Sequence, residues 1–187
     1  PCPMTYGATP GYYQVYGYDL HGNMTTMPHL PLMQWDFRDQ LQATARQRVT
    51  NGGEPETTYY VYDASGQRVR KVTERALSAR EAGAGAAPRR MKERIYLGGF
   101  EIYREYNGDG SEVTLERETL HVMDDQQRIA LVETKIKERQ ENGTVIEYGT
   151  PTHSWKPLTR YQLNNHLSSA CLELDDKAQI ISCEEYT

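Results

Sequence analysis

The chain has 187 residues, a formal net charge of −5 and a pI near 5.6. An acidic chain lacks the clustered basic face that nucleic-acid binding requires, and no apolar run approaches the roughly 20 residues of a membrane-spanning helix. Tyrosine occurs 14 times against two Phe and two Trp, which favours half-buried surfaces where the ring packs and the hydroxyl finds a polar partner.

The first predicted β-hairpin lies within residues 11–27. Tyr18 leads into Asp19, and Gly22 follows three residues later. An Asp side chain can accept a hydrogen bond from a backbone N–H two residues on, and Gly takes positive φ without a Cβ clash, so this spacing is typical of a tight chain reversal. Trp35-Asp36 begins a second copy, in which Asp39 stands where Gly is usual.

The frame is clearest at residues 59–72, where tyrosine and valine lead into Asp63-Ala64-Ser65-Gly66 and two further valines follow among charges. This pattern predicts a β-hairpin. Weaker copies begin at Asp124 and Asp175. Repetition of a hairpin predicts an array in which each unit buries its apolar face against its neighbours. We interpret the following residues as a structural repeat motif: Tyr18, Asp19, Gly22, Trp35, Asp36, Tyr62, Asp63, Gly66, Asp124 and Asp175.

The segments between the copies complete an all-β prediction. The run 107–110, Asn-Gly-Asp-Gly, is a strong hairpin signal that joins 100–106 to 112–120. Residues 75–90 are rich in Ala, Gly and Arg and predict a flexible insertion at a hairpin tip, with a short helix over 73–81 as the alternative on propensity. Polar residues 137–155 predict a long loop or a crossover. We expect residues 1–187 to form a single segment of repeated antiparallel β-hairpins, and we interpret the chain as part of a longer polypeptide.

No motif brings together side chains for catalysis. The acidic pairs 124–125, 175–176 and 184–185 are adjacent in sequence, so on a strand their side chains point to opposite faces. The histidines show no spacing typical of metal ligation; they are His21, His29, His121, His153 and His166. We predict no catalytic, cofactor-binding or metal site.

The cysteines leave two alternatives open. Asn165-His166 with Cys171 has the residue types of a thiol nucleophile and its base, but a strand-and-turn segment does not bring them together. Cys171 and Cys183 flank the turn at Asp175 almost symmetrically. Both a cross-strand disulfide and two small buried thiols fit this placement, and the sequence favours buried thiols.

Several stretches resemble the Rhs/YD-repeat family. They are the Tyr-Asp turn copies, the run Ile95–Arg104, and the run Tyr161–Ala170 with its tail to Glu185-Tyr186. The likeness is strongest to the Rhs-core end of the C component of bacterial insecticidal Tc toxin complexes, and it covers the chain from about Tyr16 onward.

The resemblance implies a fold and a role. The hairpins would wind as a curved, spiralling sheet into a segment of a hollow shell, which encloses a cytotoxic C-terminal effector of a secreted toxin and helps to deliver it. The implied partners are the remaining shell, the B-type component and the enclosed effector polypeptide. In this family a self-cleaving aspartyl protease segment lies beyond the position that matches Thr187, so the resemblance carries over no catalytic residue.

Two other functions are compatible with the residues. Tyrosine-rich β surfaces suit sugars and cell-surface proteins, and extracellular YD-repeat proteins are associated with adhesion, so a binding module is the main alternative. An enzyme of the self-cleaving kind is the other. Cleavage within this segment would distinguish the enzyme from a passive wall.

Overall fold

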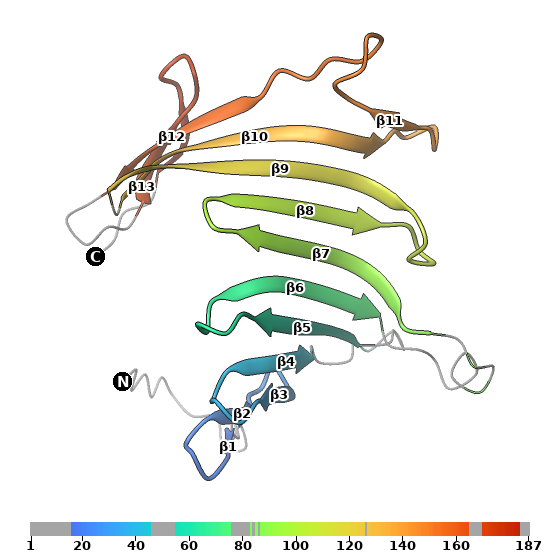
Figure 1. Ribbon diagram of the computed structural model, residues 1–187, viewed down its shortest axis with the longest axis vertical. Helices are drawn as coiled ribbons and strands as arrows, with labels where there is room; N and C mark the ends of the chain where they lie inside the picture. The colour runs from blue at the N-terminus through green and yellow to red at the C-terminus, as the bar shows by residue number, and fades with distance from the viewer. Residues whose placement is uncertain are drawn as a thin grey trace, which may run out of the picture.

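The computed structural model describes residues 16–45, 55–75, 83, 85, 87–125, 127–164 and 170–183, and the elements given below for these ranges are β-strands. Strands β1 (Gly17–Tyr18) and β2 (Met24–Thr26) pair as a small antiparallel sheet. All the others join one twelve-stranded antiparallel sheet in the order β14-β13-β12-β10-β9-β8-β7-β6-β5-β4-β3, with β11 paired to β10 (Figure 1). The expected all-β class of repeated antiparallel hairpins is confirmed.

The strands of the large sheet have the following bounds: β3 Leu32–Trp35, β4 Leu41–Ala45, β5 Glu56–Tyr62, β6 Arg68–Arg75, β7 Arg89–Leu97, β8 Phe100–Tyr106, β9 Val113–Asp124, β10 Gln127–Arg139, β11 Val145–Glu147, β12 Leu158–Asn164, β13 Ala170–Leu174 and β14 Ile180–Cys183. From β3 to β10 the strand order follows the chain, since each strand pairs with the next through a reversal. Such local pairing is what a row of hairpins predicts.

The sheet presents two chemically different faces, because side chains alternate along each strand. One face, here called the charged face, carries a row of direct cross-strand partners: Lys71, Arg94, Tyr103, Arg117 and Lys135. The opposite face, here called the mixed face, carries the neighbouring row of Val72, Glu93, Arg104 and Glu116 among aliphatic side chains.

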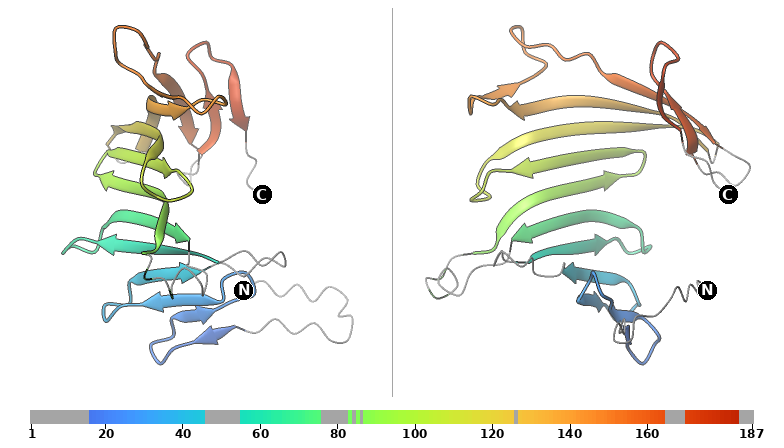
Figure 2. Two further views of the ribbon diagram at one scale, coloured as in Figure 1. Left: turned by 90° about the vertical axis from the view of Figure 1, so that its right-hand side faces the viewer. Right: turned by 180° about the vertical axis from the view of Figure 1, so that it is seen from behind.

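The sheet is curved. In both views of Figure 2 the C-terminal hairpin β13–β14 runs steeply to the direction of the central strands. Register shifts interrupt the pairings β3–β4, β5–β6, β6–β7, β8–β9, β9–β10, β12–β13 and β13–β14. An extra residue on one strand increases the local right-handed twist, so these bulges provide a physical cause for the curvature.

The buried core is thin for a chain of this length. Its buried apolar side chains in the described ranges are Met33, Ala43, Ala45, Val72 and Ala130. On the mixed face, Leu120 and Tyr161 each remain 48% exposed and Leu163 remains 51% exposed. A single twisted sheet has two faces that solvent can reach. The stripe of large side chains formed by Leu120, Tyr161 and Leu163, here called the half-open apolar stripe, is about half exposed.

Two sequence expectations need correction. The range 137–155 is not wholly loop or crossover: residues 137–139 end β10 and pair with β11. Residues 73–75 belong to strand β6 rather than to a helix, and Arg89 and Arg90 already belong to β7. The rest of the expected insertion at 75–90 lies mainly outside the described residues. No helix in the described ranges has the length and apolar character that crossing a membrane would demand.

Candidate functional site

The Asp that opens each turn braces the chain reversal. The Oδ1 atom of Asp19 accepts hydrogen bonds from the backbone N–H groups of His21 and Asn23, at 2.9 and 2.8 Å. Asp36, Asp63 and Asp175 repeat this pattern, each accepting from the residues two and four positions on at 2.8–2.9 Å. The repeated Asp therefore holds the turn by satisfying two N–H groups that the hairpin leaves unpaired.

The residue three positions after this Asp takes a left-handed conformation. Gly22 and Gly66 have φ of 88° and 86°, as the sequence pattern predicts. In the two copies without Gly, Asp39 and Ala178 occupy the same position with φ of 58° and 60°. Their backbone hydrogen bonds match those of the Gly turns, so the turn geometry persists without Gly at a cost in steric strain.

Asp124 does not belong to this set of turns. It pairs directly with Gln127 across a two-residue reversal in which Asp125 has φ of 49°. The reversal between β7 and β8 has the same spacing, with Leu97 opposite Phe100. In the other copies the Asp pairs with the residue four positions on, whereas Asp124 pairs with the residue three positions on, and the sequence pattern does not distinguish the two turn lengths.

Two further turns share the backbone pattern of the Asp copies, although sequence reasoning did not include them in the repeat. Gly110 donates to the carbonyl of Asn107, and Gly143 donates to the carbonyl of Gln140, at 2.9 Å each. The Oδ1 atom of Asn107 accepts from the N–H of Ser111, as an Asp would. The sequence signal that could have identified these two turns is a Gly three positions after a polar residue.

The aromatic residues of the motif act within the array. The indole of Trp35 donates to the carbonyl of Met24 at 2.8 Å, which ties β3 to β2. The hydroxyl of Tyr62 donates to the carbonyl of Leu41 at 3.0 Å, which ties β5 to the start of β4. Tyr18 is 60% exposed. Two of these three rings thus connect neighbouring hairpins.

Neighbouring hairpin tips are connected by side-chain hydrogen bonds. Asp39 Oδ1 lies 2.8 Å from Nδ1 of His21 and accepts from the side-chain amide of Asn23 at 2.7 Å. Arg38 donates to the carbonyl of Ala64 on the next tip at 3.3 Å. The hydrogen bond and the negative charge of Asp39 raise the pKa of His21 above its ordinary value. The unusual Asp39 thus provides the carboxylate that joins two tips.

A buried carboxylate connects four strands on the mixed face. Glu93 on β7 is 4% exposed. It accepts hydrogen bonds from Nε of Arg70 and from the hydroxyl of Tyr106, both at 2.7 Å. Nη1 of Arg90 and Nη1 of Arg104 each lie 3.8 Å from Glu93 Oε2, and Arg104 donates in turn to Glu116 on β9 at 2.6 Å.

These contacts determine the charge state of Glu93. Burial raises the pKa of its carboxyl group, but hydrogen bonds from Tyr106 and Arg70 and the surrounding guanidinium groups lower it, and the net pKa lies below the ordinary value. Glu93 stays ionised inside the sheet because its charge is paired and hydrogen-bonded. Sequence reasoning missed Glu93. The signal was available, because Glu93, Ile95 and Leu97 alternate along one strand and so place a charged residue on the face that carries apolar ones.

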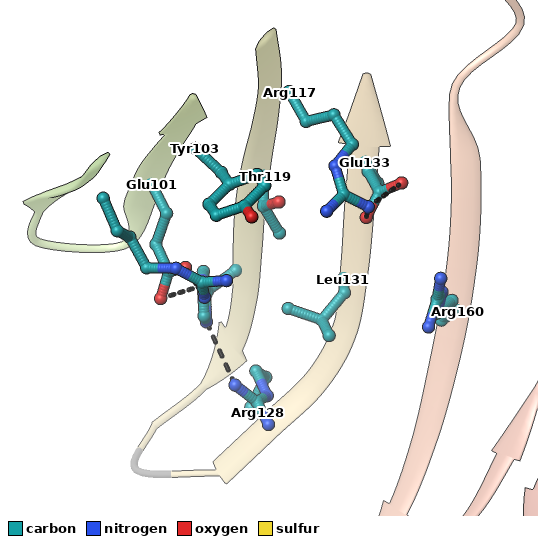
Figure 3. A pocket seen from close by; sticks show the side chains of 10 residues that line it. Glu101, Tyr103, Arg117, Thr119, Arg128, Leu131, Glu133 and Arg160 are labelled. Atoms are coloured by element: carbon teal, nitrogen blue, oxygen red, sulfur yellow. Dashed lines mark hydrogen bonds and ion pairs between the residues drawn. The ribbon is translucent and has the colours of Figure 1, made fainter. Parts of the chain in front are cut away.

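The charged face contains a hollow of about 200 Å³ between β7 and β12 (Figure 3). Four arginines from four strands line it: Arg94, Arg117, Arg128 and Arg160. The other lining residues are Glu101, Tyr103, Thr119, His121, Leu131 and Glu133. No local sequence pattern indicates this site, because its residues come from strands that are far apart along the chain.

Polar contacts run across the hollow. Arg94 donates to Glu101 at 2.8 Å, and Arg128 donates to Nδ1 of His121 at 3.2 Å. Arginine has no acceptor, so Nδ1 of His121 accepts and its proton lies on Nε2. The ring of Tyr103 lies between the guanidinium groups of Arg94 and Arg117, with centroid distances of 5.3 and 5.0 Å. This cation–π stacking offsets the repulsion between the two like charges, which lie on β7 and β9 on either side of Tyr103 on β8.

Burial and a hydrogen bond to Glu105 raise the pKa of Tyr103 to about 12. The Tyr103 hydroxyl therefore stays protonated through the physiological range and acts as a donor to the carboxylate of Glu105, at 2.6 Å.

The residues considered for chemistry are not brought together. His21 lies at a hairpin tip, His29 between β2 and β3, His121 in the hollow and His153 beyond β11, while His166 lies outside the described residues. Within the described ranges no three His, Cys, Asp or Glu side chains form a group that could hold a metal ion. Glu184-Glu185 and Asn165 also lie outside these ranges.

The preference for two buried thiols is wrong for Cys183, which is exposed and free. Its direct partner across the β13–β14 ladder is Leu172 rather than Cys171, so the register sets the two cysteines one position apart. The register shift between Glu173 and Leu174 that sets this pairing was not visible in the sequence.

The chain is similar to known toxin components. No protein-family model matches it. Toxin subunit YenC1 of Yersinia entomophaga is 29% identical over 176 residues, which cover 90% of this chain and 15% of the relative. The chain therefore spans only a small part of that relative.

Solved structures show the same fold. A TcdB2–TccC3–TEV crystal structure matches 91% of this chain, and 7% of the matched chain, with a TM-score of 0.64 at 23% identity. A TcdB2–TccC3 structure without the hypervariable C-terminal region matches 93% of this chain, and 9% of the matched chain, with a TM-score of 0.59 at 20% identity. The resemblance seen in the sequence is thus confirmed: this chain is a β-repeat segment related to the C components of Tc toxins.

Proposed function

We propose that this chain is a structural segment of an Rhs/YD-repeat shell, which encloses the cytotoxic C-terminal effector of a secreted bacterial toxin and helps to deliver it. The observation that carries the proposal is the continuity of the sheet: β3 to β14 form one twelve-stranded sheet, in which eleven strands follow one path of neighbours and β11 pairs with β10 beside that path. A wall needs such an uninterrupted sheet, whereas an isolated binding domain normally closes its sheet or covers it with a second layer.

The contacts between neighbouring strands support a mechanical role. The Asp braces hold the reversals, the tip contacts join hairpin to hairpin, and Glu93 connects β6, β7 and β8. None of these contacts needs a ligand or a reacting group. They keep a single-layer sheet in one register, which a wall requires because it has little buried core.

The half-open apolar stripe supports a place inside a larger assembly. Leu120, Tyr161 and Leu163 lie on the mixed face, each about half exposed. A soluble protein seldom leaves a contiguous apolar stripe uncovered. In the proposed shell the remaining wall, a B-type component or the enclosed polypeptide would cover it.

The alternative of a carbohydrate- or cell-surface-binding module is less well supported, because several tyrosines already have partners inside the sheet. Arg68 stacks on both Tyr60 and Tyr96, at 5.5 and 5.3 Å from the ring centroids. Tyr106 donates to buried Glu93. A sugar-binding platform needs free ring faces, and these rings have cations over them.

The proposed wall performs no reaction of its own. Glu93 and Asp63 show structural uses of acidic side chains in this sheet: Glu93 pairs with Arg70, and Asp63 braces a turn. Self-cleavage and toxicity would belong to other parts of the parent polypeptide.

Protease protection tests the proposal. The parent polypeptide that carries this chain is treated in its native state with proteinase K, and the enclosed region is followed by mass spectrometry. Val72→Asp, which places a charge at a 7% exposed position, is expected to open the wall and expose the enclosed region to digestion. The control Glu141→Gln changes an exposed tip residue and should leave protection intact. Equal digestion of the parent and Val72→Asp, or glycan binding by the native chain, would contradict the wall function.

A further inference from the structure

The hollow on the charged face carries more positive than negative charge. Four guanidinium groups face two carboxylates, those of Glu101 and Glu133, which leaves an excess of two positive charges while His121 is neutral. Figure 3 shows Arg128 and Leu131 on β10 and Arg160 on the neighbouring strand β12.

Two of the four arginines in the hollow, Arg117 and Arg160, have weak acceptors or none, whereas Arg94 donates to Glu101 and Arg128 donates to His121 and to the side-chain carbonyl of Gln162. Nη1 of Arg117 is 3.5 Å from both oxygens of Glu133, a distance at which hydrogen bonds are weak, and its buried Nε has no hydrogen-bond partner. In the described part of the chain, the guanidinium of Arg160 makes neither a hydrogen bond nor an ion pair. Arg160 also borders Asp176, but that carboxylate is already paired with Lys156 at 2.6 Å.

His121 adds another unpaired donor. Its Nε2 is buried and lies 3.2 Å from Glu101 Oε1, but not in hydrogen-bonding geometry. Buried polar groups are normally satisfied, and a cluster of unsatisfied donors around one hollow indicates a missing acceptor. A neutral ligand would leave the excess charge in place, so the missing acceptor is an anion.

We propose that this hollow is a binding site for an oxyanion, either a carboxylate or a phosphate. The planar fork of a guanidinium matches both groups and can bind either through two parallel hydrogen bonds. A volume of about 200 Å³ accommodates such a group together with several waters, since one water occupies about 30 Å³. The site is independent of the shell role, because it rests only on residues of β7 to β12.

The oxyanion has two possible sources, an acidic polypeptide segment lying across this face or free phosphate in solution. Isothermal titration calorimetry and thermal unfolding of the full 187-residue chain test both, with sodium phosphate and with a hexaglutamate peptide, against sodium chloride at equal ionic strength. We expect saturable binding and a rise in the unfolding temperature with at least one probe. Binding of phosphate alone identifies a phosphate site, and binding of the peptide alone identifies a carboxylate site.

Three variants make the test specific. Arg160→Gln should weaken binding about 10-fold without lowering stability in the absence of anion, because a hydrogen bond to a charged group is lost and no internal contact is broken. Glu133→Gln should tighten binding, because it frees Arg117 and removes a competing carboxylate. Arg38→Gln removes one positive charge at a distant hairpin tip and should leave affinity unchanged. Absence of saturable binding by either probe, or equal weakening in Arg160→Gln and Arg38→Gln, would overturn the proposal.

Discussion

Replacing Glu93 with alanine removes the carboxylate on which Arg70, Tyr106 and Arg104 converge. Breaking a buried ion pair by deleting one partner costs about 3–5 kcal/mol. The Arg70 side chain is 40% exposed, so the stranded guanidinium regains some water, and we expect a loss near the lower limit, about 3 kcal/mol. Domains of this kind have about 5–15 kcal/mol of stability in all, so this loss is a large fraction.

Urea unfolding at low protein concentration, followed by circular dichroism, measures this loss. With a slope of about 2 kcal/mol per molar urea, the midpoint should fall by about 1.5 M. The matched control is Glu147→Ala. Glu147 lies 2.7 Å from Lys137 Nζ but is 63% exposed, and exposed pairs contribute only about 0–1 kcal/mol.

The pH dependence of the Glu93 effect has a definite sign. Because the folded-state pKa lies below the ordinary 4.5, the stabilisation by Glu93 is complete above pH 4.5 and is lost as the pH falls through the folded-state pKa. The difference between the native chain and Glu93→Ala should therefore shrink in acid. Equal midpoint shifts for Glu93→Ala and Glu147→Ala at neutral pH would refute the reasoning that burial, and not distance alone, gives this pair its strength.

Three further predictions concern single groups. Ala178→Gly should raise stability by about 0.5–1 kcal/mol, because it relieves a left-handed φ of 60°; a lower urea midpoint would contradict this. The stabilisation from the His21–Asp39 pair should be present below pH 6.5 while Asp39 is ionised, and should be lost as the pH rises through the raised folded-state pKa of His21, which NMR titration of the imidazole measures; an unshifted or lowered pKa would be incompatible with the contact. Tyr103 should ionise near pH 12 in an absorbance titration at alkaline pH, and Tyr103→Phe should remove that step from the titration curve.

The hairpins were accessible from the sequence because their signals are local. The Asp63 turn with Gly66, and the run from Asn107 to Gly110, each place the reversal and both strands within a short window. The repeat frame even located Ala178, whose backbone adopts the Gly conformation. Only the turn at Asp124 was placed in the wrong class, since one Asp does not distinguish a two-residue loop from a longer one.

The functional surfaces were not accessible in the same way. Glu93 and the arginine hollow depend on which residues face each other across several strands, and bulges such as those in β7 and β10 shift that register. A shift of one residue exchanges the two faces of a strand. Arg160 and Arg94 therefore line the same hollow because of pairings between several strands, which no short stretch of sequence encodes.

Hydrogen exchange at β14 tests the proposed wall most directly. In the described residues β14 is the last strand of the sheet, paired on one side with β13. If the wall continues in the parent polypeptide, those amides of residues 180–183 that point away from β13 should be strongly protected there and should exchange rapidly in the 187-residue chain alone. Equal, fast exchange in both would show that this sheet ends at β14 and would contradict a continuous wall.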